Sequence, residues 1–106
     1  MTILPVALLQ LNSGPDITEN LKAVAAMIRD AAGQRAKFIL TPENTCHILS
    51  PQSEKLKTAP EEKDHPALPL FSSLARDLGV WILAGSIAVK VAPDRIANRS
   101  CLFDGG

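Results

Sequence analysis

Aromatic side chains are scarce in this sequence, whose 106 residues include three Phe, one Trp and no Tyr. Stacking platforms for nucleic-acid bases or sugars are therefore not expected. An excess of one charge is also missing, because 11 Lys and Arg balance 11 Asp and Glu. A formal net charge of zero leaves no electrostatic footprint for nucleic acid or for an anionic membrane surface.

Long apolar runs and export signals are absent as well. No run approaches the roughly 20 apolar residues of a membrane-spanning helix, and residues 1–5 lack the basic region of a secretory peptide. We therefore expect a cytoplasmic protein in which Cys46 and Cys101 are free thiols. No CxxC or HxxxH spacing and no glycine-rich phosphate loop occurs, so we expect neither a metal site nor a cofactor.

The first half of the chain reads as strand, helix and strand. Residues 3–11 are almost continuously apolar, which is typical of a strand covered on both faces in a parallel sheet. Asp16 and Glu19 have capping-box spacing at the start of a helix over 16–32, and Gly33 is placed to end it. A second apolar strand follows at 38–41. This order predicts a β-α-β unit and an α/β fold.

After a polar stretch at 44–66, the second half of the chain again reads as helix and strand. The mixed charge clusters of that stretch indicate a solvated face, and residues 51–57 could form a short helix. A helix is predicted over 68–78, ended by Gly79, and then an apolar strand over 80–84 with Trp81 in the core. Gly85 indicates a β-bulge or a close backbone approach. Residues 91–96 are predicted as a turn region and 100–103 as a last strand.

The chain stops at a turn signal. Asp104-Gly105 after an apolar strand predicts a hairpin, yet no return strand follows. A terminal strand with an open edge is a liability in a complete protein. We therefore expect residues 1–106 to be a single partial domain.

A carboxylate, Glu43, stands directly after the second predicted strand, beyond Pro42. Ligands of open α/β sheets bind outside the carboxyl ends of the parallel strands, so Glu43 is the candidate catalytic residue. The alternative is a helix-cap or loop carboxylate in a solvated turn. Cys46 and His47 follow closely, but neighbouring side chains rarely face each other, so we expect Cys46 to be a loop thiol rather than a nucleophile. His65 reads as a loop residue ahead of a helix.

Taken in order, the segments from Val6 to Gly106 resemble the nitrilase, or carbon–nitrogen hydrolase, superfamily. The segments that carry the resemblance are VALLQL at 6–11, ENL at 19–21, LTPEN at 40–44, ARDLGVWILAGS at 75–86 and NRSCLFD at 98–104.

This resemblance implies the N-terminal part of an αββα sandwich and a Glu–Lys–Cys catalytic set that hydrolyses non-peptide amides or nitriles through a thioester. It also implies a homo-oligomer in the intact family. Only Glu43 matches one of the three catalytic positions; Cys46 and Cys101 do not match the nucleophile's place. We therefore expect the chain alone to be inactive. The alternative from another class is a small α/β binding module that holds a partner with its exposed edge and the 44–66 segment.

Overall fold

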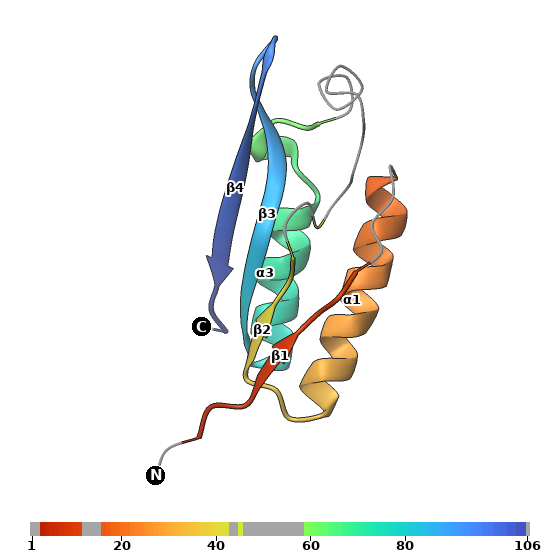
Figure 1. Cartoon of the computed structure of the whole chain (residues 1–106), viewed down its shortest axis with the longest axis vertical. Helices are drawn as coiled ribbons and strands as arrows, with labels where there is room; N and C mark the ends of the chain where they lie inside the picture. Colours follow the sequence, from red (N-terminus) through yellow and green to blue (C-terminus); the bar gives the residue numbers. More distant parts are fainter. Residues whose placement is uncertain (1–2, 12–15, 43–44, 46–58, 106) are drawn as a thin grey trace.

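The computed structural model describes residues 3–11, 16–42, 45 and 59–105 (Figure 1). Within them lie one four-stranded sheet in the order β1-β2-β3-β4, two α-helices and one 3₁₀ turn. β1, β2 and β3 are parallel, and β4 runs antiparallel to β3. The predicted α/β fold built on β-α-β units is thus confirmed. The elements are β1 (Val6–Leu8), α1 (Ile17–Gly33), β2 (Phe38–Leu40), η1 (Glu62–Asp64), α3 (Ala67–Leu78), β3 (Trp81–Ala92) and β4 (Arg95–Phe103).

α1 begins where the sequence predicts. The Asp16 carboxylate accepts a hydrogen bond from the Glu19 backbone N–H (3.2 Å), which satisfies one of the free donors of the first turn. Gly33 is the last helical residue, but the left-handed conformation that turns the chain belongs to Arg35, with φ of 73°. The apolar stripe faces the core through Leu21, Val24, Ala25, Ile28 and Ala31.

α3 is capped by a side chain from outside the helix. The buried His65 accepts a hydrogen bond from the Ala67 N–H at its Nδ1 (3.1 Å), so the imidazole is held in the tautomer that carries its proton on Nε2. At the other end Gly79 adopts the predicted left-handed conformation, with φ of 66°. His65 is therefore the expected loop residue ahead of a helix, and it also stabilises the start of that helix.

The core lies between the two helices and one face of the sheet. In the central register Ile39 of β2 pairs with Ile82 of β3, and both side chains are fully buried. Phe71 of α3 packs edge-on against Phe103 of β4, with ring centroids 5.8 Å apart. The helices lie side by side on this face (Figure 1). Sheet and helices therefore share a single apolar layer.

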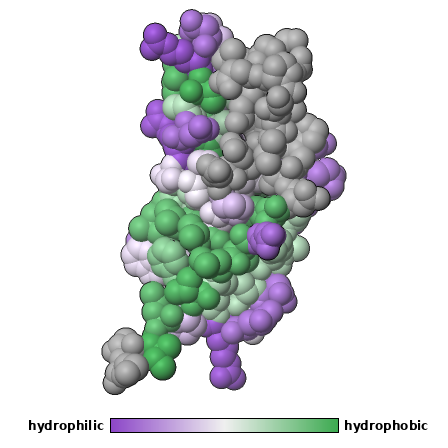
Figure 2. Space-filling model, in the orientation of Figure 1, coloured by the Kyte–Doolittle hydropathy of each residue, from purple (hydrophilic) through white to green (hydrophobic). Residues whose placement is uncertain are grey.

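The opposite face of the sheet is apolar but uncovered by the described residues. Leu8 is 73% exposed and Trp81 is 46% exposed, so the predictions that the first strand is covered on both faces and that Trp81 is a core residue are wrong. Successive strand residues face opposite sides of a sheet, and the helices cover only one side. In register this face carries Val6, Phe38 and Trp81 in one row and Leu8, Leu40, Leu83 and Leu102 in the next. A broad apolar patch is visible on the molecule in Figure 2.

β3 and β4 form a hairpin longer than the sequence predicts. The turn is confined to Pro93 and Asp94, so the predicted turn region at 91–96 is mostly strand, and β4 begins at Arg95 rather than at residue 100. Residues 95–103 are all exposed or half-buried, which suits a strand that has only one described neighbour in the sheet. The hairpin turn expected at Asp104-Gly105 remains a prediction. The homo-oligomer implied by the family resemblance also remains a prediction. The possible short helix at 51–57 lies outside the described residues.

A β-bulge interrupts this hairpin. Ala84 pairs with Cys101 and Ile87 pairs with Arg99, so Gly85 and Ser86 of β3 together oppose one residue of β4, Ser100. Two residues against one define a bulge, which bends the strand and redirects its backbone groups. The sequence-based interpretation of Gly85 is therefore confirmed.

Neither described helix combines the length and apolar character needed to cross a membrane.

We predict that the isolated 106-residue chain associates through the uncovered sheet face, because large exposed apolar patches drive association. Replacing Leu8 and Leu102, both on this face, with Lys should reduce association at least about tenfold, since burying two unpaired charges is costly. Val91→Lys, at a similarly exposed apolar residue of the hairpin, serves as the control. Sedimentation velocity over a range of concentrations measures the effect. A wild-type chain that remains monomeric throughout would contradict the prediction.

Candidate functional site at the carboxyl ends of β2 and β3

The structure describes the residues on both sides of the candidate base. Glu43 itself lies outside the described residues, as do Cys46 and His47. Pro42 and Thr45, which flank Glu43 in the sequence, are described. Pro42 comes two residues after the last residue of β2, at the edge where carboxyl ends of parallel strands meet. The surroundings of this edge can therefore be built from Thr41, Pro42, Thr45 and their partners.

Two buried threonine hydroxyls connect the end of β2 to β3. The Oγ1 atoms of Thr41 and Thr45 lie 2.8 Å apart, and the Gly85 N–H donates to Thr41 Oγ1 (3.2 Å). Thr45 Oγ1 donates to the carbonyl oxygen of Pro42. A hydroxyl has one proton to donate, so Thr41 must donate to Thr45. The result is a directed chain from the Gly85 N–H through both hydroxyls to the Pro42 carbonyl.

Backbone hydrogen bonds hold the same segment at both ends. The Thr41 N–H donates to the Leu83 carbonyl (3.0 Å), and the Thr45 N–H donates to the Ser86 carbonyl (3.1 Å). Both acceptors belong to β3, one on each side of Gly85. The chain on both sides of Glu43 is therefore anchored to a single strand.

Gly85 permits this contact because it has no side chain. A Cβ at this position would lie 2.3 Å from the Thr41 carbonyl oxygen and 2.6 Å from the Pro42 carbonyl carbon. Both are backbone atoms, which cannot move aside as a flexible side chain could. From the other side, the Ser100 hydroxyl of β4 donates to the Gly85 carbonyl. Both polar backbone groups of the bulge glycine are thus satisfied by side-chain hydroxyls.

Sequence reasoning missed Thr41, Thr45, Ser86 and Ser100 as parts of this site. Small hydroxyl residues carry no catalytic signature of their own. The available signal was weak: two threonines four residues apart bracket the Pro-Glu pair.

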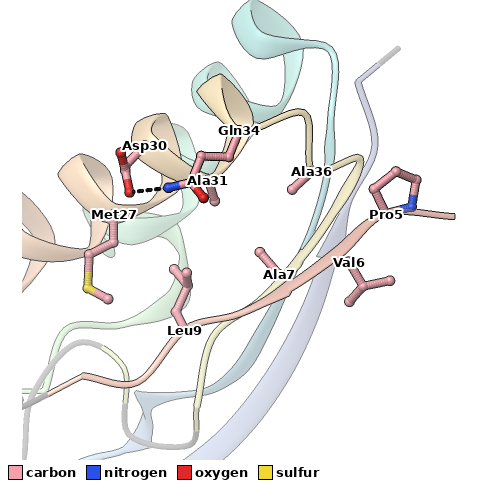
Figure 3. Close-up of a pocket in the computed structure, with 9 residues that line it drawn as sticks. All are labelled: Pro5, Val6, Ala7, Leu9, Met27, Asp30, Ala31, Gln34 and Ala36. Atoms are coloured by element: carbon pink, nitrogen blue, oxygen red, sulfur yellow. Dashed lines mark hydrogen bonds between the residues drawn. The ribbon is translucent and has the colours of Figure 1, made fainter.

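Two hollows among the described residues lie elsewhere. One of about 340 Å³ is bounded by Pro5, Ala7 and Leu9 on one side and the end of α1 on the other (Figure 3). Asp30 and Gln34, joined by a 3.0 Å hydrogen bond, provide its polar side chains. A second hollow, of about 400 Å³, lies between α1 and α3. Neither is lined by Thr41, Pro42 or Thr45, so the segment after β2 lies outside both hollows.

Cys101 does not have the surroundings of a nucleophile. Its side chain is half-buried on β4, against the core that contains Phe71. Burial raises the pKa of the Cys101 thiol, and the neighbouring Glu62 carboxylate raises it further, while Arg99 opposes them. Arg99 and Glu62 form an ion pair at 3.6 Å. Among the described residues, no three His, Cys, Asp or Glu side chains gather in a group that could hold a metal ion.

Comparison with known proteins agrees with this architecture. A deaminated glutathione amidase from Yersinia enterocolitica is 34% identical over 93% of this chain, and a chloroplastic omega-amidase from Arabidopsis thaliana is 29% identical over 97%. The chain spans only 35% and 28% of the lengths of these two relatives.

Solved structures show the same fold. The NitN amidase from Nesterenkonia sp. AN1 superposes with a TM-score of 0.82 at 25% identity, covering 97% of this chain and 40% of that protein. A CN-hydrolase superfamily protein from Xanthomonas campestris superposes with a TM-score of 0.80 at 23% identity, covering 99% and 38%.

The family model for carbon–nitrogen hydrolases matches residues 5–106, which is nearly the whole chain. The strand order, the Pro-Glu pair after β2 and the glycine of β3 all lie within this match. The chain belongs to the carbon–nitrogen hydrolase family, within the nitrilase superfamily.

Proposed function

We propose that this chain is the N-terminal part, a single partial domain, of an amidase that cleaves the carbon–nitrogen bond of a small non-peptide amide, with Glu43 as general base. One observation carries the proposal most directly. Glu43 lies in sequence between Pro42 and Thr45, two residues held against β3 at the carboxyl edge of the sheet. That edge is where α/β sheets bind ligands. The amidases among its relatives support the reaction class.

The proposed chemistry divides a difficult acyl transfer into two steps. A cysteine thiol from the remainder of the protein attacks the amide carbon, and Glu43 accepts the thiol proton. The C–N bond then breaks, the amine leaves with that proton, and a thioester remains. Glu43 next removes a proton from water, which hydrolyses the thioester to an acid and restores the thiol. A lysine from the remainder of the protein stabilises the negative oxygen of both tetrahedral intermediates.

This division leaves the chain alone without a nucleophile. Cys101 packs against the core and its pKa is raised, so it carries little thiolate at neutral pH. A base without a nucleophile or an oxyanion stabiliser supplies no covalent route. The isolated chain should therefore show no amide or nitrile hydrolysis above background. Specific capture of a partner chain by the uncovered sheet face, with no activity in any longer protein, would favour the binding module instead.

Replacing Glu43 with Gln in a full-length protein that contains this chain should lower kcat/KM about 10²–10⁴-fold, because the amide cannot accept a proton. The fold should be retained, since the change preserves shape. Glu61→Gln, at an exposed residue of the same chain, is the control and should leave the rate within about twofold. Amine or ammonia release from deaminated glutathione and from small terminal amides measures turnover, with a nitrile as the comparison substrate. A Glu43→Gln enzyme of normal rate would show that Glu43 is not the base.

Alkylation of the two thiols should separate their environments. In a Cys46→Ser chain only Cys101 reacts, and its rate should reach half-maximum above the pH of an ordinary thiol. The sign follows because burial and Glu62 both disfavour the charged thiolate. The Cys101→Ser chain reports Cys46 alone, which we expect to react without the activation of a nucleophilic cysteine.

Rates of iodoacetamide modification between pH 6 and about 11 provide this measurement, followed by mass spectrometry. A half-maximum well below that of an ordinary thiol at Cys46 would restore the alternative in which Cys46, His47 and Glu43 form a local nucleophilic set.

A further inference from the structure

We infer that Thr41 is a positioning residue for Glu43: its hydroxyl connects the bulge of β3 to Thr45 and so fixes the two ends of the segment that carries the proposed base. This inference rests on the proposed function of Glu43. Thr41 itself contacts neither the reacting atoms nor the substrate in this scheme. It acts through the backbone on both sides of the carboxylate.

Both threonine side chains are buried. Thr41 is 1% exposed and Thr45 is 0% exposed, and buried polar groups are retained only where they are hydrogen-bonded. Each hydroxyl has a donor and an acceptor partner within the chain described above. Hydrogen bonds in series polarise one another and strengthen the whole. The two threonines are therefore held in one arrangement.

Thr41 connects two parts of the chain that lie far apart in the sequence. The Thr41 hydroxyl joins the Gly85 N–H, on β3, to the Thr45 hydroxyl, which follows Glu43 in the sequence. Removing it takes away the acceptor of the Gly85 N–H and the hydrogen bond between the Thr41 and Thr45 hydroxyls. The backbone hydrogen bonds from Thr41 to Leu83 and from Thr45 to Ser86 remain, so the fold should survive. The segment 41–45 loses only its side-chain hydrogen bonds through Thr41.

Catalysis requires an accurately placed base. A general base must lie within hydrogen-bond reach of the proton it removes, and a misplacement of about 1 Å can lower the rate about 100-fold. Such sites depend on supporting residues that fix the backbone. A hydroxyl pair that brackets the base in sequence and ties both sides to one bulged strand supplies this support.

Hydrogen exchange in the 106-residue chain tests the connection directly. In Thr41→Val, which keeps the shape and removes the hydroxyl, the Gly85 amide should exchange at least about tenfold faster than in the wild type. The Val80 amide, which donates to Ala75, is the internal reference and should not change. Thr41→Ser restores the hydroxyl and should restore protection. Thr18→Val, on the exposed side of α1, is the matched control. Unchanged exchange at Gly85 in Thr41→Val would overturn the inference.

Kinetics in a full-length protein test the consequence. Thr41→Val should lower kcat about 10–100-fold with KM within about threefold, and Thr41→Ser should recover kcat to within about threefold of wild type. All variants are assayed well below their melting temperatures, so that a loss of folded protein does not appear as a loss of kcat. A wild-type kcat in Thr41→Val, or a failure of Thr41→Ser to recover it, would refute a positioning role.

A double-mutant cycle separates failure of this inference from failure of the proposed function. If Thr41 acts through Glu43, Thr41→Val should add less than about twofold to the loss already caused by Glu43→Gln. Losses that multiply would show that Thr41 acts independently of Glu43, and would overturn the inference while leaving the base intact. Normal turnover in Glu43→Gln alone would reject the proposed base, and the positioning role with it.

Discussion

The contact between Gly85 and the backbone of Thr41 and Pro42 is the constraint on which the rest of the site depends. With any side chain on residue 85, β3 and the end of β2 would separate, since a Cβ would meet the Thr41 carbonyl oxygen at 2.3 Å. Separation would break the hydrogen bond from the Gly85 N–H to Thr41 and the backbone bond from Thr45 to Ser86. One missing methyl group therefore permits the whole set of hydroxyl and backbone contacts around the Pro-Glu pair.

Features set by neighbouring residues were predictable from the sequence. Asp16 and Gly79 mark helix ends because capping requires a short polar side chain or a left-handed residue within one turn. The exposure of Leu8 and Trp81 was not predictable in this way, because a strand's pattern does not reveal whether a second layer covers it. The Thr41–Gly85 bond was also inaccessible, since the two residues are 44 positions apart. The sequence thus identified a strand-end carboxylate but not the hydroxyls of its surroundings.

The described residues cover one face of the sheet and leave the other face uncovered. Two helices close one face, whereas the other presents rows of Leu, Val, Phe and Trp to the surroundings. The chain spans about a third of its amidase relatives, and the proposed mechanism likewise needs groups that this chain does not supply. Under the proposed function the uncovered face and the proposed base therefore have the same need, since each would be completed by groups that the described residues do not supply.

The bulge also changes which kinds of genetic change the strand can tolerate. Before it, even-numbered residues of β3 such as Ile82 and Ala84 face the core; after it, odd-numbered residues such as Ile87 and Val89 do. The extra residue reverses the parity of the alternation. Deleting Gly85 or Ser86, or inserting one residue beside them, would move the core-facing side chains of one half of β3 to the opposite face of the sheet. A change of length at this point should therefore disturb the sheet more than most side-chain substitutions, and we expect insertions and deletions in natural variants to avoid it.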